Sequence, residues 1–96
     1  MKIKFKDINT GVVQARAVIE IQPGIYLNEV TILKKYGKIE VELPNKSFKG
    51  KDGKIHNMPV ITFQNEDKKY LWKLEIKNEY KNWRKKNPII EVYEND

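Results

Sequence analysis

The sequence predicts an α+β fold, in which a meandering antiparallel β-sheet carries one long C-terminal helix packed on it. Two patterns predict this fold. Apolar and polar residues alternate through most of residues 1–43, and an apolar stripe recurs at helical spacing between residues 66 and 86. The chain has 96 residues. This length suits a single domain over residues 1–96, because a chain this short cannot bury a second core.

Four strands are expected in the first part of the chain. Met1–Ile8 alternates lysines with apolar residues, and Val13–Ile21 places its apolar residues on one face. Ile25–Leu33 is rich in β-branched residues, and Ile39–Leu43 alternates again until Pro44, which cannot donate to a sheet ladder. Turn residues separate these strands, at Asn9–Gly11, Pro23–Gly24 and Tyr36–Lys38.

The stretch that follows is basic and lacks a regular pattern. Asn45–Lys54 holds two glycines, an Asp-Gly pair and four lysines against one aspartate. These features predict an exposed, basic hairpin loop. A further strand is expected over Ile55–Phe63, and Pro59 restricts it to a sheet edge or an irregular segment.

A helix is expected from Asn65 to about Lys86. Asn65 is a suitable N-cap, and the acidic residues Glu66 and Asp67 follow it, where the helix dipole favours negative charge. Asn87-Pro88 ends the helix, because the residue before a proline disfavours helical geometry. The tail Ile89–Tyr93 is a candidate for one more strand.

The helix carries an aromatic stripe that has two interpretations. At 100° per residue its members fall within about 80° of one another, which favours the core over a base-stacking platform. The stripe consists of Trp72, Ile76, Tyr80 and Trp83. Three apolar residues lie off the stripe, and they either widen the buried face or mark where a second chain packs: Tyr70, Leu71 and Leu74.

Five lysines repeat every four residues along the same helix. We call Lys69, Lys73, Lys77, Lys81 and Lys85 the lysine row. Each like-charged neighbour at this spacing costs about 0.2–0.5 kcal/mol, so a helix shaped only for its own stability would interleave the signs. The row is either a solvated face or a surface that contacts phosphates.

The composition excludes several kinds of chemistry. The chain has no cysteine, and Ser47 and His56 are its only serine and histidine. A thiolate metal site, a disulfide and a zinc site are therefore excluded. A serine triad is improbable, because Ser47 and His56 are the only residues that could form one. No phosphate-binding glycine motif is present. We expect no catalytic residue, metal or cofactor and no enzyme activity, and the chain shows neither a signal peptide nor a membrane-spanning stretch.

Scattered positions carry a resemblance to a known family. They are Ile25–Val30, Tyr36-Gly37, Leu43–Lys46, Asp52-Gly53 and Pro59-Val60. Over about residues 1–80 the chain resembles the SpoVG family of septation and sporulation regulators. The resemblance implies a small α/β domain that dimerises through its sheet, and a regulator that binds DNA and RNA in the bacterial cytoplasm. It also implies DNA contact by basic residues at Lys68, Lys69 and Lys73.

The net charge of +6 leaves more than one kind of partner open. The first hypothesis is a cytoplasmic, homodimeric regulator that binds nucleic acid and not a membrane. The alternative is an interaction module that binds an acidic protein through the same basic face. The residues expected to contact phosphates are Lys46, Lys49, Lys51, Lys54, Lys68, Lys69, Lys73, Lys77, Lys81 and Arg84.

Overall fold

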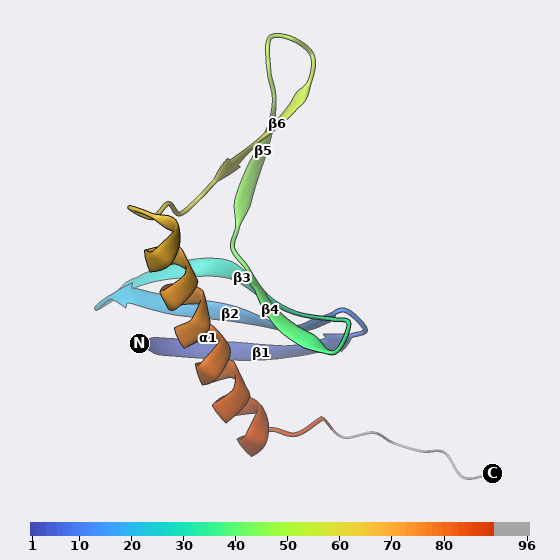
Figure 1. The fold of residues 1–96 in the computed structure, drawn as a ribbon, viewed down its shortest axis with the longest axis vertical. Coiled ribbons are helices and arrows are strands. Elements are labelled where there is room, and N and C mark those ends of the chain that lie inside the picture. Colours follow the sequence, from blue (N-terminus) through green and yellow to red (C-terminus); the bar gives the residue numbers. More distant parts are fainter. Residues whose placement is uncertain (90–96) are drawn as a thin grey trace, which may run out of the picture.

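The computed structural model describes residues 1–89 and has the expected α+β architecture. Four strands form an antiparallel meander in the order β1-β2-β3-β4, two more form a separate hairpin, and one helix follows (Figure 1). The strands are β1 (Lys2–Thr10), β2 (Val13–Gln22), β3 (Ile25–Lys35), β4 (Lys38–Glu42), β5 (Asn45–Lys49) and β6 (Ile55–Pro59), and the helix is α1 (Glu66–Lys86).

The turn between β3 and β4 shows how the local sequence sets the meander. Lys35 pairs with Lys38, so only Tyr36 and Gly37 lie between the strands. Both have positive φ, at 51° and 77°. A two-residue turn with positive φ at both positions matches the twist of antiparallel strands, and it fixes the register of β4 against β3.

The core lies between one face of the sheet and α1. The helix crosses this face diagonally (Figure 1), and it buries Ile76 and Tyr80 against the strands. Ala15 and Ala17 of β2 are fully buried beneath it. The expected aromatic stripe is confirmed as core, since Trp72 and Trp83 pack against the same cluster.

The ends of α1 agree with the sequence. The side chain of Asn65 accepts a hydrogen bond from the Lys68 backbone N–H at 2.9 Å, which satisfies one of the free donors of the first turn. Asn87 caps the other end through its backbone N–H.

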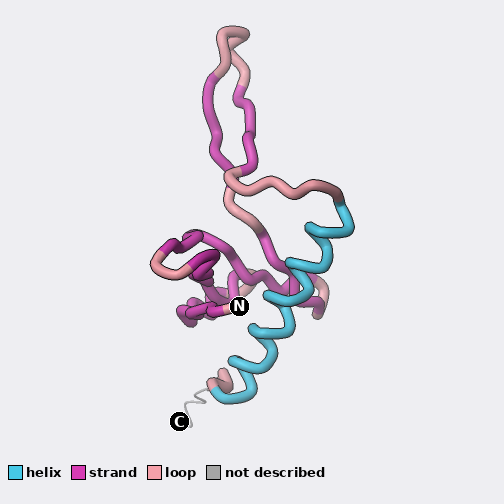
Figure 2. Tube along the Cα trace, turned by 90° about the vertical axis from the view of Figure 1, so that its left-hand side faces the viewer, coloured by secondary structure: helices cyan, strands magenta, loops and turns pink. Residues whose placement is uncertain are grey.

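The segment after β4 differs from the expectation. The first half of the expected loop is strand β5, which pairs with β6 from Asn45↔Pro59 to Lys49↔Ile55. The expected strand Ile55–Phe63 ends at Pro59, because proline offers no N–H to continue a ladder. We call Asn45–Pro59 the arm. It stands away from the sheet and helix (Figure 2).

Two further expectations concern the tail and membranes. The candidate strand Ile89–Tyr93 lies outside the described residues except for Ile89, which is not in a strand. Within residues 1–89, no helix combines the length and the apolar character needed to cross a membrane.

Candidate nucleic-acid interface

The lysine row winds along α1 beside the edge strand β4. Successive members are four residues apart, so each turns about 40° further round the helix than the one before it. Lys69, Lys73 and Lys77 are half-buried, whereas Lys81 and Lys85 are exposed. The row therefore starts against β4 and turns outward to solvent.

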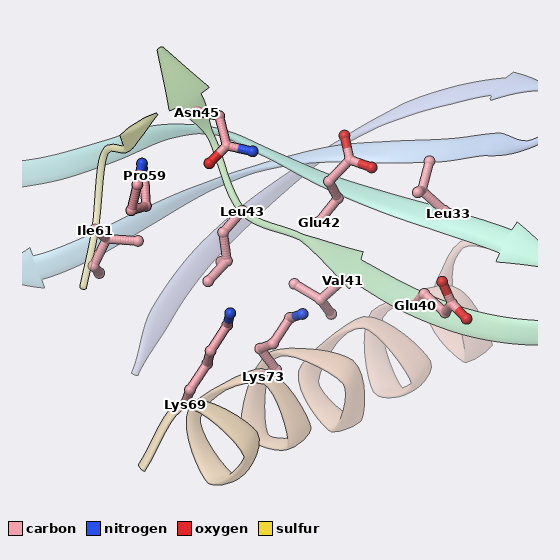
Figure 3. A pocket seen from close by; sticks show the side chains of 10 residues that line it. All are labelled: Leu33, Glu40, Val41, Glu42, Leu43, Asn45, Pro59, Ile61, Lys69 and Lys73. Atoms are coloured by element: carbon pink, nitrogen blue, oxygen red, sulfur yellow. The ribbon is translucent and has the colours of Figure 1, made fainter. Parts of the chain in front are cut away.

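The first two lysines line a hollow between α1 and β4. Lys69 and Lys73 extend toward Val41 of β4 and toward Leu43, the residue after β4, and both of these apolar side chains point to the helix (Figure 3). Both lysines are half-buried at this edge of the sheet. Glu40 and Glu42 also line this hollow, so two carboxylates border it near the first turns of α1.

The charges of the row are not neutralised inside the molecule. Within residues 1–89, none of the five lysines is in an ion pair. A positively charged row without internal partners is available to a negatively charged ligand.

Apolar side chains lie among these lysines. Tyr70 and Leu74 line a second hollow with Lys73 and Lys77 against β4. The two side chains are exposed at 66% and 36%. Of the two interpretations that the sequence left open for Tyr70, Leu71 and Leu74, burial within this chain is wrong, because Leu71 is also 61% exposed.

The structure adds Lys34 to the basic surface. Lys34 of β3 pairs with Ile39 of β4, which faces the helix, so it emerges on the helix side of the sheet. It lines a third hollow with Lys81 and Lys85. The alternation of β3 carries the signal that sequence reasoning missed, because Lys34 shares a face with the core residues Val30 and Ile32.

The arm supplies a second group of cations. Lys46, Lys49, Lys51 and Lys54 are all exposed. The base of the arm adjoins the row, since Asn45 and Pro59 line the same hollow as Lys69 and Lys73. The base of the arm therefore lies beside the start of the row, whereas Lys49, Lys51 and Lys54 lie toward the far end of the arm.

Arg84 is engaged inside the protein. Its guanidinium donates to both carboxylate oxygens of Asp7, at 3.0 and 3.2 Å, and to the Tyr80 hydroxyl at 3.0 Å. It also stacks over the Trp83 ring, 4.7 Å from the centroid. The hydrogen bonds from Arg84 lower the pKa of Asp7, and Asp7 raises the pKa of Arg84. Arg84 therefore links α1 to β1, and its guanidinium is not available to contact phosphates as the sequence predicted.

Lys68 lies apart from the row. It is exposed in the first turn of α1, but it is offset from every lysine of the row by about 100° or more around the helix axis. Its positive charge faces another flank of the helix.

The arm separates the two residues that a hydrolase would need together. Ser47 pairs with Asn57 across the strands, whereas His56 pairs with Phe48 at the next position, so the serine and the histidine lie on opposite faces. Ser47 donates to Asn57 at 2.7 Å, and His56 contacts Asp52 at 3.1 Å.

Comparison with known proteins adds no identity. No family model, no curated protein and no solved structure matches this chain. The resemblance to the SpoVG family therefore stays a prediction that rests on the quoted residues alone.

Proposed function

We propose that this protein is a regulatory protein that binds nucleic acid, and that the lysine row and the arm lysines contact phosphates. The observation that carries the proposal is the row itself: five lysines on one winding line, in no ion pair within the described residues, beside a basic arm. The SpoVG resemblance supports the same function.

The dimensions of the row suit a nucleic-acid backbone. Lys69 and Lys85 are sixteen residues apart, which corresponds to about 24 Å along a helix. A duplex presents a phosphate about every 1.7 Å of its axis, so several phosphates lie within reach of such a row. Binding then releases condensed counterions, and the affinity falls steeply with salt.

The energetic cost of the row also supports a function. The four pairs of neighbouring lysines in the row together destabilise the helix by about 1–2 kcal/mol before screening by salt. Dipole stabilisation at the helix C-terminus offsets this cost for Lys85, but it does not reach Lys73 and Lys77. A negatively charged ligand would offset the repulsion between the mid-helix lysines.

The test is a gel-shift titration with duplex DNA, single-stranded DNA and RNA at two salt concentrations. We expect binding at low salt, and we expect the double variant Lys77→Gln/Lys81→Gln to flatten the slope of log K against log salt by about 1–2. The matched control, Lys68→Gln/Lys86→Gln, removes the same charge from the same helix on another flank. Equal effects of the two variants, or no binding at low salt, would contradict the proposal.

A second candidate function is binding of an acidic protein at the same surface. The exposed Tyr70, Leu71 and Leu74 favour it, because aromatic residues are enriched in protein interfaces and exposed apolar patches mark interaction sites. In that case Leu74→Ala weakens partner binding as strongly as the lysine changes do. Phosphate binding predicts little effect of Leu74→Ala.

The proposal includes a homodimer formed through the sheet. No described element covers the face of the sheet opposite α1 (Figure 2). On this uncovered face the register aligns Lys6, Arg16, Thr31 and Glu42 in one row across all four strands. Positive charge at β1 and negative charge at β4 make the face complementary to a second copy of itself.

A further inference from the structure

The arm is a two-stranded ribbon with both faces open. All ten residues of β5 and β6 are exposed. Among the described residues the arm joins the body only at its base, where the Val60 N–H donates to the Pro44 carbonyl at 3.1 Å. An isolated two-stranded hairpin is marginally stable in water, so its persistence as a projecting ribbon needs an explanation.

The tip of the arm is held by its own hydrogen bonds. The Gly50 N–H donates to the Lys54 carbonyl at 2.9 Å, and Asp52 accepts from the Lys54 N–H at 2.9 Å. The hydrogen bonds from the Lys54 backbone N–H and from His56 lower the pKa of Asp52. Gly50 lies directly beneath the His56 ring, since a Cβ at this position would come within 2.7 Å of it. The tip is therefore a preformed shape.

The two faces of the arm differ in chemistry. One face carries the cross-strand ring pair Phe48 and His56, stacked at 5.5 Å between centroids. The other carries Ser47, Asn57 and Lys49. The Ser47 hydroxyl donates to the side-chain oxygen Oδ1 of Asn57, and within residues 1–89 the side-chain NH2 group of Asn57 has no hydrogen-bond partner. That face presents unused hydrogen-bond donors.

We propose that the arm lies in the major groove of a DNA duplex, with Ser47, Lys49 and Asn57 against the base edges and Lys51 and Lys54 near phosphates. The inference rests on the proposed function and specifies its ligand; among the arm lysines, it assigns Lys49 to a base edge instead of a phosphate. The major groove of B-form DNA is about 12 Å wide and admits a two-stranded ribbon, and its base edges present acceptors to lysine and asparagine.

The same geometry disfavours duplex RNA. The major groove of A-form RNA is deep and narrow, and side chains do not reach its bases. The four lysines of the arm against one aspartate supply the positive charge that either backbone attracts. Groove shape, not charge, is therefore the feature that selects DNA.

The ring pair has an explanation within the arm. A cross-strand aromatic pair contributes about 0.2–1 kcal/mol to a hairpin, which the otherwise uncovered ribbon requires. The alternative interpretation of the face with Phe48 and His56 is that Phe48 stacks on unpaired bases. The test below separates this interpretation from groove binding.

The test uses full-length protein and four probes of one sequence. They are a plain DNA duplex, the same duplex with glucosylated 5-hydroxymethylcytosines that fill the major groove, the RNA duplex, and single-stranded DNA. We expect affinity for the plain duplex to exceed that for the filled and RNA duplexes by about tenfold or more, the worth of about one good base contact. In Lys49→Gln/Asn57→Ala this ratio falls toward one. In Lys77→Gln/Lys81→Gln all duplex affinities fall and the ratio stays.

Three results would overturn the inference. The first is equal binding of plain and filled duplexes by the wild-type protein. The second is tighter binding of the single strand that is lost in Phe48→Ala, which would assign the arm to base stacking. The third is loss of a dimer in Lys49→Gln/Asn57→Ala with unchanged duplex affinity, which would assign the arm to a second copy. No binding to any probe contradicts the proposed function itself.

Discussion

Arg84 joins parts of the chain that are far apart in sequence. Asp7 lies in β1, 77 residues away, and the Gln14 carbonyl of β2 accepts a further hydrogen bond at 3.4 Å. The Arg84 side chain is only 16% exposed. From the sequence, Arg84 is one more cation beside the lysine row. No local pattern distinguishes it, because its role depends on where the sheet brings Asp7.

This ion pair predicts a change of stability in acid. Arg84 holds the pKa of Asp7 below its ordinary value of 3.8 in the folded protein. The pair therefore stabilises the fold above about pH 4, and this stabilisation is lost as the pH falls through the lowered pKa. We expect Asp7→Asn to melt at a lower temperature than the wild type at pH 7, and the difference to shrink in more acidic solution. Melting curves followed by circular dichroism from pH 2 to pH 7 check this.

The matched comparison is Asp52→Asn. Asp52 also has a lowered pKa, but its partners belong to the arm tip, which lies apart from the core. Its replacement should leave the melting temperature of the body nearly unchanged. A pH profile of Asp7→Asn that runs parallel to that of the wild type would show that Asp7 is not the group responsible.

At the scale of elements, the body and the arm differ in what holds them. In the body, α1 covers the sheet and buries Ile76 completely. In the arm, Ile55 is 68% exposed. Ile76 and Ile55 have the same side chain in opposite environments. Replacing each of them therefore measures how much the stability of the body and of the arm depends on burial.

Ile76→Ala should lower the free energy of unfolding by about 2–5 kcal/mol, since it removes buried methyl groups and leaves a cavity beneath the sheet. Ile55→Ala should cost less than about 0.5 kcal/mol, as an exposed substitution does. Urea denaturation followed by tryptophan fluorescence measures both. Similar losses for the two variants would mean that Ile55 is buried in solution and that the arm has a partner in the free protein.

The elements also show where sequence reasoning succeeds. The meander and the helix follow from periodicity, and the N-cap Asn65 from local hydrogen bonding. The same reasoning predicts that the lysines follow one another along α1, because helical geometry alone fixes their directions around the helix axis. It places β5 in a loop, because Asn45–Lys49 lacks the alternation of a half-buried strand. A strand exposed on both faces has no such pattern, so only the pairing with β6 defines it.

At the scale of the whole molecule, local sequence patterns do not reveal which surfaces become neighbours in the folded protein. Lys34 belongs to the basic surface because β3 and β4 pair with Lys34 opposite Ile39, and the arm adjoins the row because its base lies beside the first turns of α1. These placements depend on three-dimensional packing. The sign of each surface can be read from the residues, but its extent cannot.

The uncovered face of the sheet leads to the last prediction. A two-fold axis parallel to the strands would place β1 of one copy over β4 of its partner, so Lys6 of each copy would lie opposite Glu42 of the other. Lys6→Glu then sets like charges opposite each other twice per dimer and should weaken association, by about tenfold or more if the pairs are desolvated. The charge swap Lys6→Glu/Glu42→Lys restores complementarity and should recover the dimer. Sedimentation equilibrium measures all three proteins. A wild-type monomer, or a swap variant no better than Lys6→Glu, would contradict this arrangement.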